Sequence, residues 1–155
     1  MTEARSIMTK KIIKVKPEMP IQIACEEMKK NGIRHLPVTD QTGKLVGILS
    51  DRDVQRAVNV RMINEVELEM TFNPHDTVEN FMSWPVQTVD EKTSIAELTK
   101  MMIDLKISAC VVNGPNEYIK GIITTENLLK YLLELITTSD NNWAIPIGKT
   151  HWEHI

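Results

Sequence analysis

The chain has 155 residues, of which 42% are hydrophobic, 25% charged and 5% aromatic, a composition that is ordinary for a globular protein and indicates neither a disordered nor a membrane class. Its formal charge of −3 conceals an asymmetry, because residues 1–58 carry eleven Lys and Arg against seven Asp and Glu, net +4, and residues 59–155 carry seven against fourteen, net −7. The basic excess favours an anion near the first half but is too small for a nucleic-acid-binding surface.

Two elements are expected at the start of the chain. Residues 7–16 alternate apolar and basic side chains, include β-branched types and stop at Pro17, which predicts a short strand. Residues 21–28 place apolar side chains at i, i+3, i+4 and i+7, the spacing of a helix with one apolar face. Gly32 can adopt the left-handed conformation that ends such a helix.

A hairpin and a second helix complete this unit. Residues 33–38 and 45–49 are short apolar stretches joined by a polar turn that contains Gly43, which predicts two strands. The helix that follows begins at Ser50 with a Ser-x-x-Asp pattern. This pattern either caps a helix N-terminus or binds a ligand.

The same order of elements returns 74 positions downstream. Residues 81–90, 95–105, 107–112 and 119–123 repeat the strand, the helix and the two hairpin strands, and a second helix begins near Thr124. The residues of the first copy that recur unchanged at this displacement are Met8, Val15, Ile21, Met28, Ile33, Val38, Gly47 and Ile48. Because most of them are apolar, the repeat is first of all a repeated core pattern.

We therefore expect an α+β fold in which two βαββα repeats pack face to face about a pseudo-two-fold axis, since a unit of about 50 residues buries too little apolar surface alone. The expected divisions are repeat 1 at residues 5–58, a linker at 59–80, repeat 2 at 81–136 and a C-terminal tail at 137–155. The linker pattern leaves a short strand and a strained helix open. Trp143 in the tail indicates docking on the chain's own body or on a second subunit.

Several classes of site have no support in the sequence. No run approaches about 18 apolar residues and residues 1–5 lead into no apolar segment, so we expect no membrane span and a cytoplasmic protein.

Cys25 and Cys110 do not occupy equivalent repeat positions, which favours buried, reduced thiols over a disulfide or metal site. His151 and His154 are expected in a mobile tail rather than at a zinc ion. No hydrolase, P-loop or zinc-protease motif is present, so we expect no enzyme.

With the repeat, the Arg-His-Leu-Pro-Val strand at residues 34–38 and the two Gly-x-x-[Ser/Thr]-x-x-[Asp/Asn] turns, the sequence resembles a tandem pair of CBS (cystathionine-β-synthase-type) domains, a Bateman module. The first repeat is similar to stand-alone bacterial CBS pairs of the acetoin-utilisation type. The resemblance covers roughly residues 5–136. It implies a regulatory module that needs no cofactor, binds an adenine nucleotide or S-adenosylmethionine between the repeats, forms a homodimer through its helices and acts on a partner protein of unknown identity.

The resemblance also implies a first ligand cleft. Its residues would be Ile13, Lys14, Val15, Arg34, His35, Ser50, Arg52 and Asp53. The Asp53 carboxylate would accept both ribose hydroxyls, Ser50 would lie near the phosphate or ribose, and Ile13 to Val15 would flank the base. Arg34 and His35 would bind phosphate.

A second cleft is implied in the other repeat. Its residues would be Val86, Gln87, Thr88, Thr124 and Asn127. Asn127 is neutral, and Ser108 and Ala109 stand where the first repeat has Arg34 and His35, so the cationic side chains for a phosphate are missing. We expect the first cleft to be occupied and the second to be weak or empty.

Simpler interpretations remain beside these. Capping alone accounts for Ser50 and Asp53, and it is the favoured explanation for Thr124 and Asn127. Arg34 and His35 can equally form a solvated face. The alternative function is a ligand-independent homodimeric scaffold with vestigial clefts, because the apolar run over residues 128–136 is wider than one core-facing stripe requires.

Overall fold

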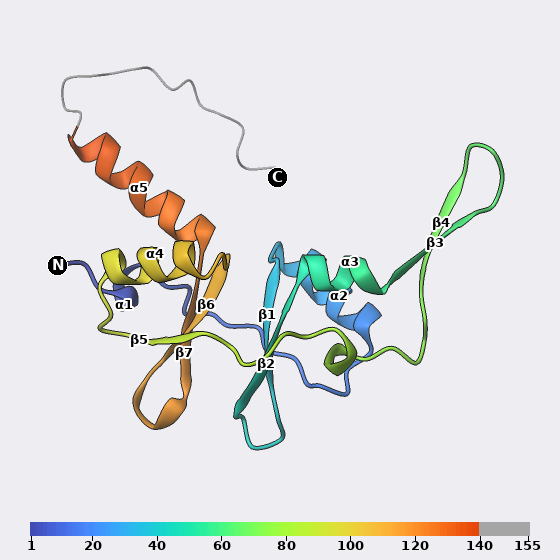
Figure 1. The fold of residues 1–155 in the computed structure, drawn as a ribbon, viewed down its shortest axis with the longest axis horizontal. Helices are drawn as coiled ribbons and strands as arrows, with labels where there is room; N and C mark the ends of the chain where they lie inside the picture. Colours follow the sequence, from blue (N-terminus) through green and yellow to red (C-terminus); the bar gives the residue numbers. More distant parts are fainter. Residues whose placement is uncertain (140–155) are drawn as a thin grey trace.

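The computed structural model describes residues 1–139, so Trp143, His151, His154 and most of the predicted tail lie outside the described residues. The elements in chain order are α1 (Ala4–Ile7), α2 (Ile21–Asn31), β1 (His35–Thr39), β2 (Leu45–Ser50), α3 (Asp51–Ala57), β3 (Val58–Met62), β4 (Leu68–Phe72), the 3-10 helix η1 (Val78–Asn80), β5 (Thr88–Asp90), α4 (Ile95–Asp104), β6 (Ala109–Asn113), the 3-10 helix η2 (Pro115–Glu117), β7 (Ile119–Thr124) and α5 (Thr125–Ser139). Figure 1 shows two lobes side by side, each built on a β-hairpin with helices above it.

The predicted repeat is confirmed, including its displacement of 74. In the first lobe β1 and β2 pair antiparallel with His35 opposite Ser50, and in the second β6 and β7 pair with Ala109 opposite Thr124. Both hairpins carry a register shift at the equivalent place, after Val38 and after Val112. The two copies therefore share their backbone irregularities as well as their element order.

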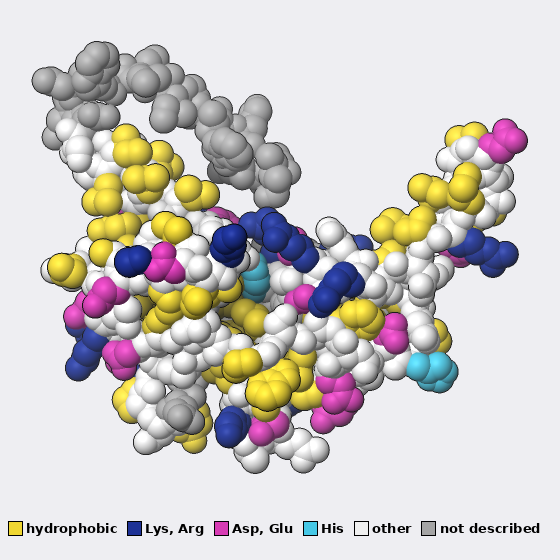
Figure 2. Space-filling model, in the orientation of Figure 1, with side chains coloured by type: hydrophobic (Ala, Val, Ile, Leu, Met, Phe, Trp, Pro, Cys, Tyr) yellow, Lys and Arg dark blue, Asp and Glu magenta, His cyan; other side chains and the backbone are white. Residues whose placement is uncertain are grey.

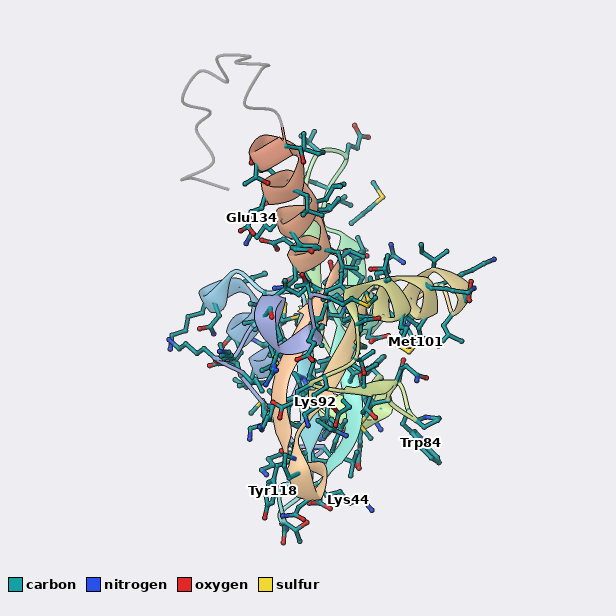
Figure 3. All side chains as sticks on the ribbon, turned by 90° about the vertical axis from the view of Figure 1, so that its left-hand side faces the viewer. Lys44, Trp84, Lys92, Met101, Tyr118 and Glu134 are labelled. Carbon is teal, nitrogen blue, oxygen red and sulfur yellow. The ribbon has the colours of Figure 1, made fainter. Side chains whose placement is uncertain are left out.

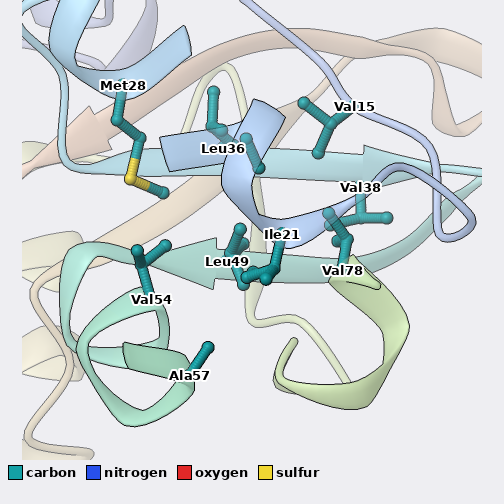
Figure 4. Packing of buried hydrophobic residues seen from close by; sticks show 10 residues of the cluster. Val15, Ile21, Met28, Leu36, Val38, Leu49, Val54, Ala57 and Val78 are labelled. Atoms are coloured by element: carbon teal, nitrogen blue, oxygen red, sulfur yellow. The ribbon is translucent and has the colours of Figure 1, made fainter. Parts of the chain in front are cut away.

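The first lobe has a closed apolar core (Figure 4). Ile21 and Met28 from the predicted apolar face of α2 pack against Leu36 of β1 and Leu49 of β2, and all four are at most 5% exposed. Gly32 has φ 61° and ends α2 as predicted, since glycine adopts the left-handed region without a steric cost. A second cluster around Leu98, Met102 and Ile123 forms the core of the other lobe.

The first segment of each repeat packs on the other lobe, which the sequence did not reveal. Ala4 of α1 is fully buried in the second-lobe cluster, and its N–H donates to the carbonyl of Thr93 over 2.8 Å. Val78 of η1 is fully buried in the first-lobe cluster. The two lobes are thereby joined by an exchange of segments as well as by contact.

The prediction of a strand over residues 7–16 is wrong. The segment holds the end of α1 and then an irregular stretch with isolated bridges, Thr9 to Ile122 and Val15 to Val38. Because the segment crosses from one lobe to the other, it reaches a strand edge only one residue at a time. In the second repeat a three-residue strand forms, β5, which pairs parallel with β6.

Two equivalent glycines allow the exchanged segments to approach. A Cβ on Gly47 would collide with the Met82 side chain, and a Cβ on Gly121 would collide with that of Met8. Since Met82 and Met8 lie in the exchanged segments, the glycines are required by close packing rather than by a special backbone angle.

The linker contains a strand pair, which settles the alternative that its sequence left open. β3 and β4 form an antiparallel hairpin that projects from the first lobe (Figure 1). Figure 3 shows α5, labelled at Glu134, projecting on the side opposite to the tips of the two repeat hairpins, labelled at Lys44 and Tyr118. Within residues 1–139 no helix is both long and apolar enough to cross a bilayer.

The cysteines follow the expectation only in part. Both thiols are free; Cys110 is buried and Cys25 is half-buried. Burial raises the pKa of Cys110 to about 12, which makes this thiol unreactive near neutral pH.

Candidate ligand-binding cleft

A cleft of about 480 Å³ lies between the two lobes. One wall comes from the first repeat, with Ile12 and Ile13 of the crossing segment and Arg34 and His35 at the start of β1. The facing wall comes from the second repeat, with residues at the end of β7 and in the first turns of α5. The residues of this facing wall are Ile122, Thr124, Glu126, Asn127 and Lys130. The cleft is within the range of about 300–1,000 Å³ that small-molecule sites occupy.

Cationic side chains dominate the charge of the cleft. Figure 2 shows Lys and Arg side chains gathered over the junction between the lobes. Lys130 pairs with Glu126 over 2.6 Å, and the pKa of Glu126 is lowered by this hydrogen bond, then by the Lys130 charge, with a further contribution from Arg34. Among the described residues, neither Lys11 nor Arg34 has a side-chain hydrogen bond or ion pair, so the donors of both cations are open to a ligand in the cleft.

His35, which lines the cleft, connects the two repeats. Its Nε2 lies 3.1 Å from the hydroxyl oxygen of Ser108, a residue of the second repeat. Burial lowers the pKa of His35 below its ordinary 6.5, and the neighbouring Asp51 carboxylate opposes this shift without reversing it. The folded protein therefore favours the neutral imidazole.

This shift predicts a loss of stability on mild acidification. Since the pKa of His35 is lower folded than unfolded, its contribution is present above pH 6.5 and is lost as the pH falls through the folded value. We expect the free energy of unfolding, measured in urea from pH 7.5 to 5, to fall more steeply for the wild type than for His35→Gln. An identical slope in both proteins would contradict the assignment.

Asn127 ties the N-terminal segment to the start of α5. Its Oδ1 accepts hydrogen bonds from the N–H and hydroxyl of Thr124 at 2.9 and 3.0 Å. Its Nδ2 donates to the carbonyl of Ile7 at 3.0 Å and to the hydroxyl of Thr9 at 3.1 Å. Both polar atoms of this amide are thus engaged within the protein.

The equivalent position in the first repeat, Asp53, uses different chemistry. Ser50 and Asp53 form a capping box at the start of α3, in which Asp53 Oδ2 accepts from the Ser50 N–H at 2.8 Å. Arg56 donates to Asp53 Oδ1 at 2.8 Å and also to the carbonyl of Phe81 at 3.1 Å. Phe81 is the repeat equivalent of Ile7. In the first repeat Arg56 therefore donates the hydrogen bond to this carbonyl, whereas in the second repeat Asn127 donates it directly.

The structure groups the predicted site residues differently from the sequence. Ile13, Arg34 and His35 of the predicted first cleft line one hollow together with Thr124 and Asn127 of the predicted second cleft. The reason is the crossing of residues 8–16, which sets the first repeat against the start of α5. Sequence reasoning also missed Lys11, Ile12, Glu126 and Lys130, because no local pattern marks a wall shared between repeats.

The other predicted residues lie elsewhere. Those absent from the lining of this cleft are Lys14, Val15, Ser50, Arg52, Asp53, Val86, Gln87 and Thr88. Val15 is 2% exposed in the first core. Val86 and Thr88 line a separate hollow of about 560 Å³ beside Trp84, which is 74% exposed. Ser50 and Asp53 hold the start of α3.

The fold and the repeat agree with a family comparison. The CBS domain family model matches the chain twice, at residues 4–60 and 78–134. The chain belongs to the CBS domain family, and its two repeats form a CBS domain pair.

Individual relatives support this assignment. An uncharacterised 17.7 kDa protein of Acidianus ambivalens is 28% identical over 136 residues, 88% of this chain and 76% of the relative. The crystal structure of the CBS domain pair of protein MJ0100 in complex with 5′-methylthioadenosine and S-adenosyl-L-methionine superposes with a TM-score of 0.72 at 25% identity, covering 87% of this chain and 98% of that one. A Vibrio cholerae protein described as an acetoin utilization protein superposes with a TM-score of 0.73 at 22% identity, covering 92% and 98%.

Proposed function

We propose that this CBS pair is a regulatory module that binds an adenosine-containing ligand with an anionic group in the cleft between Ile13 and Asn127. The observation that carries the proposal is the cleft itself, which combines an apolar wall with two cations, Lys11 and Arg34, that make no side-chain hydrogen bond or ion pair among the described residues. The structural relative solved with 5′-methylthioadenosine and S-adenosyl-L-methionine supports the adenosine part of the ligand.

Each part of such a ligand has a counterpart in the cleft. Ile12, Ile13 and Ile122 offer apolar surface for a purine ring. Arg34 and Lys11 offer donors for phosphate, and a guanidinium can bind two phosphate oxygens at once. The Thr124 hydroxyl donates to Asn127 and keeps acceptor capacity for a ribose hydroxyl.

The ligand would act by changing how the lobes sit against each other. His35 and Ser108 join the two repeats beside the cleft, so a ligand that contacts Arg34 and α5 together would bias this junction. A partner protein would then respond to the altered surface. This role needs no catalytic group and no cofactor.

A second proposal is self-association through α5. None of the residues of α5 is buried, although the helix carries a run of large apolar side chains. Leu128, Leu132 and Leu135 also line an almost wholly apolar hollow of about 440 Å³ against α4. Such a surface is typical of an interface, and it supports a homodimer whether or not the cleft holds a ligand.

Ligand binding is tested by calorimetry and thermal shift with AMP, ADP, ATP, S-adenosylmethionine and 5′-methylthioadenosine. We expect measurable heat and a rise in Tm for at least one of them, because a ligand that binds only the folded state stabilises it by about 2.7 kcal/mol at 100 times Kd. Absence of binding by all five at millimolar concentration would contradict the ligand proposal. The ligand-independent homodimeric scaffold would then be the remaining function.

A further inference from the structure

The projecting hairpin β3–β4 has one apolar face. Val60 lies opposite Met70 and Met62 lies opposite Leu68, and opposed residues of an antiparallel pair place their side chains on the same face. All four side chains are exposed, by 59 to 70%. The other face carries polar and charged pairs, including Arg61 opposite Glu69.

The hairpin gains little stability from the rest of its own chain. It is a separate two-stranded sheet, and such a sheet alone is marginally stable in water. Both of its strands are also edges, which natural proteins cover or blunt with charge. The apolar face of a hairpin that projects from the body (Figure 2) is therefore typical of a surface that a partner covers.

The second lobe carries a matching arm. The C-terminal part of α5 exposes large apolar side chains by 45 to 64%: Leu129, Leu132, Leu133, Leu135 and Ile136. Val58, where the hairpin begins, is 74 positions before Leu132, so the hairpin occupies in the first repeat the place that the second half of α5 occupies in the second. Figure 1 shows both arms rising from the same side of the body, at opposite ends.

The two arms also match in length. The part of α5 from Leu129 to its end at Ser139 spans about 16 Å as a helix. A five-residue strand such as β3 spans about 17 Å before the turn of the hairpin is added. The arms stand at opposite ends of one chain and project to the same side. A two-fold axis perpendicular both to the line between the arms and to the direction in which they project therefore sets each hairpin beside the α5 of a second copy.

We propose that the apolar face of the β3–β4 hairpin, defined by Val60, Met62, Leu68 and Met70, packs on the exposed face of α5 of a second copy of this chain, twice in a two-fold dimer. The inference rests on the self-association proposed above and adds its counterpart surface. Burying both arms covers nine exposed apolar side chains per chain, and an apolar core of this kind is typical of a homodimer interface.

Cross-linking between two differently substituted chains tests the pairing. In a Cys25→Ser background, a chain with Met62→Cys is mixed with a chain with Leu133→Cys and treated with a short bismaleimide. We expect a covalent heterodimer in several-fold excess over the same mixture made with Arg61→Cys, which lies on the polar face of the hairpin. A predominant product between two Met62→Cys chains would overturn the pairing, because it would set hairpin against hairpin.

Sedimentation velocity separates this inference from self-association itself. Met62→Glu should weaken the dimer by about 100-fold, because a charge would be buried without a partner. Thr71→Glu, on the polar face, should leave the dimer unchanged. A wild-type dimer that resists Met62→Glu overturns the hairpin contact and leaves self-association standing, whereas a monomeric wild type overturns both. Unchanged far-UV circular dichroism shows that the variants fold.

Discussion

Replacing Arg34 with alanine should lower the affinity of the cleft for a phosphate-bearing adenosine ligand by about 10- to 100-fold. The guanidinium lines the cleft and has no side-chain partner among residues 1–139, so it is available to the ligand. A hydrogen bond to a charged group contributes about 1.5–3 kcal/mol, which corresponds to this loss. Calorimetry with the ligand that the wild type prefers measures it, and uncharged 5′-methylthioadenosine should lose far less.

Arg52→Ala is the matched control for this prediction. The resemblance placed Arg52 in the same cleft as Arg34, but the structure puts it on α3, exposed and outside the lining. Its charge is screened by solvent, so its removal should change the affinity little. If Arg52→Ala and Arg34→Ala lost affinity equally, the ligand would lie near Asp53 instead, and the grouping predicted from the sequence would hold.

The elements with regular local patterns could be predicted from the sequence. The apolar spacing of residues 21–28 marks α2 because a helix must bury one face, and the constant displacement of 74 carries the same assignment to α4. The hairpins β1–β2 and β6–β7 follow from short apolar stretches around turns. Each of these depends on neighbours within a few residues.

The crossing segments could not be predicted in this way. The burial of Ala4 depends on Leu98 and Ile95, some ninety residues away, and nothing in the local pattern of residues 4–9 indicates which lobe they join. The composition of the cleft depends on that crossing. The resemblance named Ile13, Arg34 and His35 for one cleft and Thr124 and Asn127 for another, and the sequence did not indicate that these residues line one cleft together.

The hairpin β3–β4 was hidden for a different reason. The alternation of Glu and apolar residues over 65–70 is typical of a strand, yet β3 directly follows the last turn of α3. A two-stranded ribbon with an exposed apolar face is also a poor expectation for an isolated chain, since its stability depends on a covering partner. A second copy supplies that partner in the proposal above.

The difference between Asp53 and Asn127 has acquired a structural explanation. From the sequence, Asn127 was expected mainly as a helix cap, and the resemblance implied a weak counterpart of the ribose-binding carboxylate. In the structure each position ties the other repeat's first segment to a helix start, through Nδ2 at Asn127 and through Arg56 at Asp53. An aspartate works in the first repeat because Arg56 supplies the donor that a carboxylate lacks.

Asn127→Asp should therefore lower the free energy of unfolding by about 1–3 kcal/mol, the cost of leaving polar groups unpaired. A carboxylate at this position keeps the two bonds from Thr124 but has no donor for the carbonyl of Ile7 or the hydroxyl of Thr9. Its negative charge would also face the oxygen of Ile7. Urea unfolding at pH 7 measures the loss.

Two further variants decide whether the lost donor is the cause. Asn80→Asp makes the same change in the cap of η1, where Oδ1 accepts from Thr77 in the same way but Nδ2 makes no hydrogen bond among the described residues, so stability should hardly change. Adding Lys130→Arg to Asn127→Asp recreates the arrangement of Asp53 with Arg56 and should recover part of the loss. Equal destabilisation by Asn80→Asp, or no recovery in the double variant, would show that the amide donor does not hold the crossing segment.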